Sequence, residues 1–254
     1  MKSKTVLPHI KALKIIFSLF VILVIWETFA LIVNDSYFLP DVFETVRALF
    51  DIFLSGTFFK VVFTAFYRVS AGLALGVLAG ISVALLCHKF DIVNTVLSPI
   101  ISIMKATPVA CIIVLLWIRL NYTEIAIFVV VLMVLPIVWQ NVYDGCKAID
   151  DGLTEVADVF ELTRWQRLRV LLFPSVLTYL LPAIITSVGL AWKAEVAAEI
   201  MTNSNIGRLI YDFKTVSYDT ASIFAWTVVI VVLSIAFESI AKRVLGGLIN
   251  GLKA

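Results

Sequence analysis

Charged residues are scarce in this 254-residue chain. They make up 15% of it, whereas hydrophobic residues make up 61% and the mean hydropathy is +1.04. A soluble domain carries about 25% charged residues and roughly 45–50% apolar ones. The net charge of +2 is too small to favour nucleic acid as a partner. The composition therefore places the chain in a lipid bilayer.

Motifs of catalysis and metal binding are missing from the sequence as well. It contains no G-x-x-x-x-G-K-[ST] loop to cradle a phosphate, and no HExxH or GxSxG motif. The cysteines Cys87, Cys111 and Cys146 lie far apart, and neither His9 nor His88 stands at metal-ligand spacing from one of them. We therefore expect no metal site, no cofactor and no enzymatic activity in this chain.

Long apolar runs predict about six transmembrane helices, since about 20 apolar residues span a bilayer as a helix. The first run exceeds the length of a cleavable signal core and no A-x-A-like site follows it, so we expect a retained helix. The sequence predicts an all-α membrane protein with a single transmembrane domain over residues 1–254 and a core over 61–245. The expected spans are 15–33, 61–86, 103–120, 125–142, 175–200 and 222–245.

Basic residues orient these spans, because cytoplasmic segments carry an excess of Lys and Arg. A cytoplasmic N-terminus gives twelve basic residues in the inner segments against five in the outer ones. We therefore expect a multi-pass bacterial inner-membrane protein with both termini in the cytoplasm. The inner residues are Lys2, Lys4, Lys11, Lys14, Lys89, Lys147, Arg164, Arg167, Arg169, Lys242, Arg243 and Lys253, and the outer ones are Arg47, Lys60, Arg119, Arg208 and Lys214.

Two segments between the spans are long enough to form structure. Residues 40–55 begin with Pro40, carry Asp41 and Glu44 in the first turn, and continue with apolar residues at helical spacing. They predict an amphipathic helix on the outer interface. Residues 143–173 form the longest cytoplasmic segment and have helical composition, which indicates a docking element.

Within this cytoplasmic segment the sequence runs E-V-A-D-V-F-E-L-T-R-W-Q from Glu155 and continues to Pro174. This run resembles the EAA loop of ABC importer permeases, and Pro174 falls in register with the proline of that pattern. Val156 replaces the first Ala of the pattern, and Glu161 stands where the family has a glycine, whose backbone freedom a Glu lacks. An amphipathic loop helix without a docking role is the simpler alternative. The expected ATPase-coupling residues are Glu155, Val156, Ala157, Val159, Phe160, Glu161, Leu162, Thr163, Arg164 and Trp165.

Further segments resemble permeases for nitrate, sulfonates, taurine and related small organic molecules. They include TAFYRVSAG at 64–72, LLW at 115–117, GLAWKAEVAAEI at 189–200 and FAWTVVIVVLS at 224–234; Arg119 replaces a usual Gly. The resemblance implies a type I ABC importer permease fold and a homodimer or pseudo-dimer around a central path. It also implies ATPase subunits that bind ATP and Mg, and an extracellular binding protein or lipoprotein. The expected solute is a sulfonate-, taurine- or nitrate-like molecule or a heterocyclic vitamin precursor.

Polar residues within the predicted spans are candidates for the translocation path. A charged residue at the bilayer centre costs at least about 2.5–3.5 kcal/mol, so such side chains should face protein or water. Glu195 and Glu199 share one helical face, and Lys193 lies elsewhere on the helix. Pathway lining and a structural role, with pairing to Arg208 or Arg68, both stay open. The path candidates are Arg68, Trp192, Lys193, Glu195 and Glu199.

Glycines at four-residue spacing, Gly72, Gly76 and Gly80, allow two helices to approach closely. We expect them to pack within the chain, with a dimer seam as the alternative. Two other function classes are alternatives to an ATP-driven transport subunit. A secondary transporter or channel should lack a docking loop and often shows internal repeats, and an intramembrane enzyme needs a catalytic cluster. The sequence favours the transport subunit.

Overall fold

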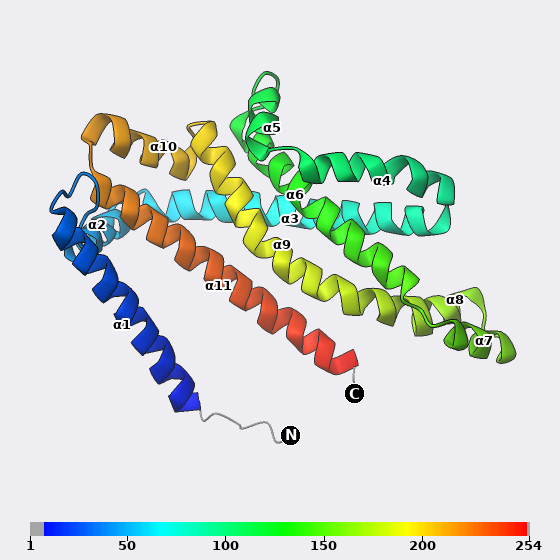
Figure 1. Cartoon of the computed structure of the whole chain (residues 1–254). Helices are drawn as coiled ribbons and strands as arrows, with labels where there is room; N and C mark the ends of the chain where they lie inside the picture. The colour runs from blue at the N-terminus through cyan, green and yellow to red at the C-terminus, as the bar shows by residue number, and fades with distance from the viewer. Residues whose placement is uncertain (1–7, 253–254) are drawn as a thin grey trace. The chain divides into compact units, whose positions relative to one another are not determined.

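The computed structural model describes residues 8–252, and the regular elements within that range are all helices (Figure 1). The chain divides into two compact units. The first consists of Met1–Phe58 and Ile210–Val229, and the second of Phe59–Leu209 and Ile230–Ala254. Lys2, Lys4 and Lys253, which contribute to the predicted orientation, lie outside the described residues.

Five helical stretches are long and apolar enough to cross a membrane. They lie within Ile16–Val33, Phe58–Lys89, Tyr122–Lys147, Arg164–Met201 and Thr220–Gly247. Helices α4 (Asp91–Ala106) and α5 (Val109–Leu116) give a sixth crossing if this bent pair is counted as one span. The prediction of an all-α protein with about six apolar spans is confirmed.

The third predicted span, 103–120, is wrong as a continuous helix. Helices α4 and α5 meet there at an angle of 97°. Thr107 and Pro108 between them have extended backbones, with ψ of 126° at both residues. Pro108 has no N–H to donate, and its ring disfavours the helical conformation at Thr107. Pro99, by contrast, lies inside α4.

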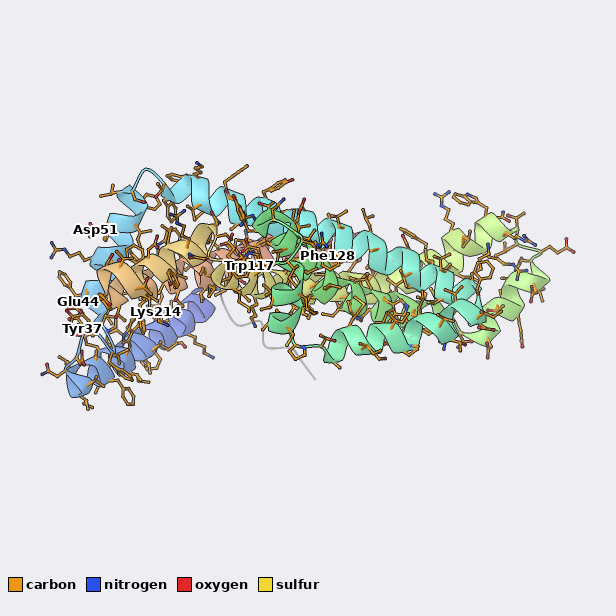
Figure 2. All side chains as sticks on the ribbon, turned by 90° about the horizontal axis from the view of Figure 1, so that it is seen from above. Tyr37, Glu44, Asp51, Trp117, Phe128 and Lys214 are labelled. Atoms are coloured by element: carbon orange, nitrogen blue, oxygen red, sulfur yellow. The ribbon has the colours of Figure 1, made fainter. Side chains whose placement is uncertain are left out.

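The first unit contains α1 (Pro8–Val33), α2 (Val42–Leu54) and the short π-helix η2 (Phe213–Ser217). Asp41 and Glu44 form a capping box at the start of α2, and the carboxylate of Glu27 accepts a hydrogen bond from Val42 N at 3.0 Å. Glu27, although it lies in an apolar helix, is therefore used to cap the next helix. Figure 2 shows Tyr37, Glu44 and Asp51 in the same part of this unit, where they help line a polar cavity of about 300 Å³.

The second unit contains α6 (Tyr122–Lys147) and most of α3 (Phe58–Lys89). The two helices pack through the three glycines spaced four residues apart, because a Cβ there would lie only 2.6–2.8 Å from a valine Cβ of α6. The expectation of packing within the chain is confirmed. The pairs are Gly72 with Val130, Gly76 with Val134 and Gly80 with Val138.

Helix α9 (Phe173–Met201) packs along α6. Gly145 of α6 allows this approach, since a Cβ at that position would lie 3.0 Å from the Cα of Val176. The hydroxyl of Ser175 donates a 2.6 Å hydrogen bond to the Gly145 carbonyl. Helices α3, α6 and α9 thus provide a closely packed frame for the residues discussed below.

Candidate functional site

Helix α9 connects the two groups of residues that the sequence singles out. It is preceded without a break by α8 (Arg164–Arg167) and the π-helix η1 (Leu168–Leu172). The predicted coupling residues lie before and within α8, and the predicted path residues other than Arg68 lie in the C-terminal half of α9. With 29 residues, α9 is about 43 Å long and separates the two groups by most of a bilayer.

The coupling segment forms two short, individually capped helices. The side chain of Asp150 accepts from Gly152 N at 2.7 Å and begins α7 (Asp151–Val159). Thr163 begins α8 in a capping box with Gln166. The caps satisfy backbone donors that would otherwise lack partners, so both helices are held although they are short.

The turn between α7 and α8 has the conformation that glycine adopts most easily. Glu161 has a φ of 50°, in the left-handed region. Leu162 N donates to Ala157 O and Glu161 N donates to Asp158 O, each at 3.0 Å, which is a Schellman motif with Glu161 at the position usually taken by glycine. The replacement of glycine by Glu161 therefore keeps the turn, at a strain of about 1–2 kcal/mol.

Arg167 holds this turn from the side of α8. Its Nε donates to Leu162 O at 3.0 Å, and its Nη2 forms an ion pair with Asp158 at 2.5 Å. These bonds join the end of α7 and the turn to the last residue of α8. They help fix the left-handed residue between the two helices.

The coupling segment exposes large apolar side chains. Val159 is 81% exposed, and Phe160 and Trp165 are each 73% exposed. Ala157 is buried and anchors α7. Among the ten predicted coupling residues, Leu162 is half-buried, and Glu155, Val156, Glu161, Thr163 and Arg164 are exposed with the three named above. Such a surface on capped helices suits contact with another protein.

At the other end of α9, Arg68 of α3 and Glu199 form a buried ion pair. The distance from Arg68 Nη1 to Glu199 Oε1 is 2.7 Å, and the two side chains are 4% and 0% exposed. Arg68 Nη2 also donates to the hydroxyl of Thr123 at 3.0 Å, and its guanidinium lies 5.7 Å from the centre of the Tyr122 ring. The pair therefore links α3 and α9 to the start of α6.

Glu199 also accepts two bonds from the start of α10 (Asn205–Asp212). Asn205 Nδ2 donates to Oε1 at 2.8 Å and Ile206 N donates to Oε2 at 3.0 Å. Gly207 allows this contact, because a Cβ there would overlap the backbone of Glu199. Asn205 and Thr123 are not among the predicted path residues, because a polar residue at the start of a helix is too common a pattern to indicate a buried ion pair.

The remaining path candidates have different surroundings. Glu195 is fully buried, and among the described residues neither of its carboxylate oxygens has a hydrogen-bond partner. Trp192 is buried with its ring edge-on to Phe237, at a centroid distance of 6.3 Å. Lys193 is exposed on another face of α9. The structure thus joins Arg68 to Glu199, buries Glu195 and Trp192 nearby, and leaves Lys193 at the surface of the chain.

Solved structures identify the fold. The chain superposes with a TM-score of 0.61 on a protein described as an amino acid ABC transporter crystallised with histidines, covering 79% of this chain and 94% of that one at 18% identity. The MetNI methionine ABC transporter in an inward-facing conformation gives a TM-score of 0.58 over 77% of this chain, with 95% of that chain covered, at 16% identity. The architecture is that of a type I ABC importer permease.

Comparison of the sequence with protein families leads to the same class of protein as the fold. Residues 72–248 match the model of the binding-protein-dependent transport system inner membrane component, and the chain belongs to that family. It is the permease subunit of an ABC importer and a multi-pass inner-membrane protein.

Three curated relatives are 27–29% identical to the chain over the aligned residues. A Bacillus subtilis protein named as an aliphatic sulfonates transport permease, SsuC, is 27% identical over 87% of this chain and 81% of its own length. The bicarbonate transport system permease protein CmpB of Synechocystis is 29% identical over 62% of this chain and 58% of its own length. The formylaminopyrimidine transport permease protein ThiX of Halalkalibacterium halodurans is 27% identical over 87% and 89%, respectively.

Proposed function

We propose that this permease imports a small oxyanion or organic solute and is driven by ATPase subunits that bind the segment Glu155–Trp165. The observation that carries the proposal is the pair of capped helices α7 and α8 with Val159, Phe160 and Trp165 exposed. So much apolar surface on a loop indicates that it contacts a protein partner rather than remaining exposed to water. The partner subunits bind ATP and Mg, whereas this chain binds no cofactor and catalyses no reaction.

The proposed orientation places both termini and the coupling segment in the cytoplasm. The excess of Lys and Arg in the corresponding segments supports it. An extracellular binding protein or lipoprotein then delivers the solute to the opposite face.

A second copy of the chain completes the proposed translocation path. Lys193 supports this part of the proposal, because it is exposed in the single chain although it lies eight residues before the end of α9. A charged side chain facing lipid there would be costly, so we infer that a homodimer partner or a water-filled path covers it. Arg68, Glu195 and Glu199 then form a buried cluster behind the path.

Two observations support an anionic solute: the positive charge of Lys193 and the solutes for which the relatives are named. An ammonium group in the path favours an anion, and the relatives are named for aliphatic sulfonates and bicarbonate. A heterocyclic vitamin precursor is the second candidate, because one relative of nearly full coverage is named for formylaminopyrimidine. Binding assays of the cognate binding protein with both solute classes discriminate between them.

Co-purification tests the partner proposal. The full chain is expressed with its ATPase subunit, and Phe160→Asp is compared with Val216→Asp, an apolar position that is also 73% exposed but lies outside the coupling segment. We expect Phe160→Asp to lose the ATPase and Val216→Asp to retain it. Undiminished co-purification with Phe160→Asp, or after scrambling residues 155–165, would overturn the proposal.

Uptake kinetics test the path proposal. Lys193→Gln should raise the KM for an anionic solute at least several-fold without reducing the amount of folded protein in the membrane. If uptake kinetics are unchanged, Lys193 does not line the path.

A further inference from the structure

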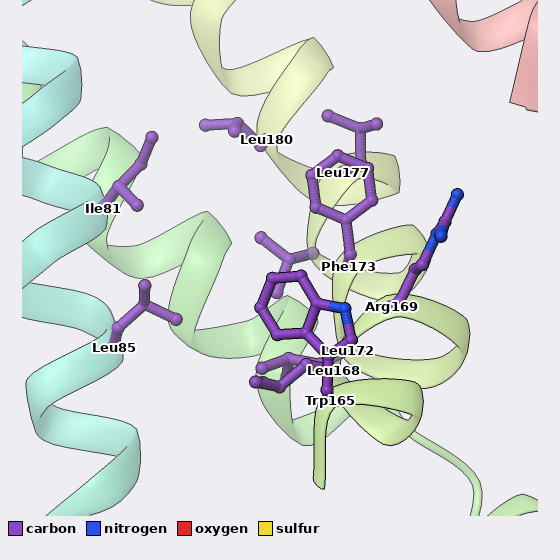
Figure 3. A pocket seen from close by; sticks show the side chains of 10 residues that line it. Ile81, Leu85, Trp165, Leu168, Arg169, Leu172, Phe173, Leu177 and Leu180 are labelled. Carbon is purple, nitrogen blue, oxygen red and sulfur yellow. The ribbon is translucent and has the colours of Figure 1, made fainter. Parts of the chain in front are cut away.

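The two sides of α9 face different surroundings. On one side, an apolar cavity of about 540 Å³ lies between α3 and the stretch from α8 through η1 into α9, and Leu180 contributes to its lining. Figure 3 shows Arg169, the one charged residue among the ten described residues that line this cavity, directed away from Ile81 and Leu85. The cavity therefore lacks the convergent polar groups that orient a polar solute. This side of α9 does not suit a solute path.

The opposite side of α9 faces α11 (Thr220–Leu252). Gly189 follows Leu180 by about two and a half turns of helix and so lies on that side. A Cβ at Gly189 would lie 3.7 Å from Oε2 of Glu238, a residue of α11. The carboxylate of Glu238 is thus directed toward α9, at a position where α9 has no side chain.

Glu238 lies at membrane depth. Gly189, which it contacts, is about 24 Å along the helix from the first residue of α9. The residue before Glu238 lies at the same level, because the Phe237 ring is edge-on to that of Trp192, three residues after Gly189. A charged side chain at this depth faces protein or water, since exposure to lipid costs at least about 2.5–3.5 kcal/mol.

Three charged side chains share this region of the second unit. Lys193 follows Gly189 by four residues and so projects from the same side of α9. Oε1 of Glu238 pairs with Nζ of Lys242, one turn further along α11, at 2.5 Å. Lys193 forms no ion pair in the part of the chain that the structure describes. Two ammonium groups and one carboxylate leave a single positive charge in this region.

These charges are not covered by the chain itself. The side chains of Glu238 and Lys242 are 34% and 56% exposed, and Lys193 is exposed as well. An apolar face of a second copy would bury Lys193 without a countercharge, which is costly. A water-filled path leaves all three groups hydrated and is therefore the better match.

We propose that Glu238 lines the translocation path beside Lys193 and limits the positive charge of the path by neutralising Lys242. This inference rests on the proposed function, in which Lys193 lies in the path of an anion. Lys193 attracts the anion, and the Glu238–Lys242 pair keeps the attraction weak enough for the anion to leave again. The net charge of each copy suits a singly charged anion.

Cysteine accessibility tests where Glu238 lies. In the assembled transporter, with the three native cysteines of the permease replaced, Glu238→Cys and Lys193→Cys are compared with Ile240→Cys in their reaction with a water-soluble methanethiosulfonate. Ile240 is 58% exposed but lies about 200° around α11 from Glu238. We expect the first two variants to react about tenfold faster than Ile240→Cys, because only they face water.

The outcomes separate this inference from the proposed path. Slow reaction of Glu238→Cys together with rapid reaction of Lys193→Cys would overturn the role of Glu238 and leave the path along Lys193 intact. Slow reaction at both positions would overturn the proposed path as well.

Charged thiol reagents test whether Glu238 sets the charge of the path. The reporter is Ala197→Cys, which projects from the same side of α9 as Lys193. The measurement is the ratio of its reaction rates with a sulfonate-bearing and a trimethylammonium-bearing methanethiosulfonate. Glu238→Gln frees the charge of Lys242 and should raise this ratio at least about threefold.

Two further variants show whether the effect belongs to the ion pair. Glu238→Gln/Lys242→Gln restores the single positive charge and should return the ratio to that of the reporter alone. Arg243→Gln removes a neighbouring exposed arginine and is the matched control, which should leave the ratio unchanged. An unchanged ratio in Glu238→Gln, or equal changes in Glu238→Gln and the double variant, would contradict the proposal.

Discussion

The two ends of the α8–α9 stretch differ in which side chains they bury: charged side chains are buried at one end, and apolar side chains are exposed at the other. At the C-terminal end, the charged pair Arg68 and Glu199 is buried and its bonds are made within the chain. At the N-terminal end, Trp165 of α8 and the preceding Val159 and Phe160 at the end of α7 are exposed although they are apolar. The first arrangement is complete in a single chain, whereas we propose that an ATPase subunit covers the second. The comparison therefore separates a pair of residues bonded within the chain from an apolar surface that is available for contact with a partner.

The largest expected effect comes from breaking the buried pair. Arg68→Met leaves the Glu199 carboxylate buried without its countercharge and beside a second buried carboxylate, Glu195. Removing one partner of a buried ion pair costs about 3–5 kcal/mol. We expect a loss of this size in the free energy of unfolding, measured by denaturant titration in mixed micelles.

Two matched variants sharpen this result. Arg119→Met removes an arginine that is exposed, and it should change the free energy of unfolding by no more than about 0.5 kcal/mol. The double variant Arg68→Met/Glu199→Leu should recover part of the loss, because no unpaired charge of that pair remains. A loss for Arg68→Met no larger than that for Arg119→Met would show that the pair does not stabilise the fold.

The second-largest loss of stability is expected when the close packing of α3 on α6 is disturbed. Gly76→Ala places a Cβ 2.8 Å from the Cβ of Val134, so α3 and α6 must move apart. Overpacking of this kind costs about 1–3 kcal/mol, measurable as a lower thermal unfolding midpoint in detergent. Gly56→Ala is the control, since no atom lies within 4 Å of a Cβ at Gly56. Equal midpoints for the two variants would contradict the close packing of α3 on α6.

The smallest effect, of opposite sign, is expected in the coupling segment. Glu161→Gly relieves a left-handed conformation that costs about 1–2 kcal/mol for a non-glycine residue, while the gain in freedom of the unfolded chain offsets about 0.4–1 kcal/mol. We expect a net stabilisation of up to about 1.6 kcal/mol, observed as slower hydrogen exchange in α7 and α8. Glu155→Gly, inside α7, should accelerate exchange instead. Faster exchange in Glu161→Gly would rule out the strained turn.

Local sequence patterns predicted those features of the fold that are determined by residues close together in the sequence. Apolar runs predicted the spans, and the glycine repeat predicted close packing within the chain, although only the structure shows that α6 is the partner of α3. Pro108 broke the third span because its effect on Thr107 is stronger than the apolar content of the run. The EAA pattern places a glycine at position 161, but only the structure shows that Glu161 adopts the left-handed backbone conformation that favours glycine.

The buried ion pair could not be predicted from local sequence patterns, because it joins residues that are far apart in the sequence. Arg68 and Glu199 are 131 residues apart in the sequence, and the spacing of Glu195 and Glu199 gave no means of deciding which carboxylate pairs with Arg68. The start of α10 decides it, because Asn205 and Ile206 donate to Glu199. The exposure of Lys193, likewise, follows from how α9 packs rather than from its sequence.

Uptake of solute into proteoliposomes tests the central claim most directly, namely that this permease works only with a separate ATPase bound at its coupling segment. The purified chain is reconstituted with and without the ATPase subunits, in the presence of ATP and the loaded binding protein. The account predicts uptake only when the ATPase is present, and none when the chain carries Phe160→Asp. Full uptake by the chain without any ATPase would contradict the account and favour a secondary transporter or channel.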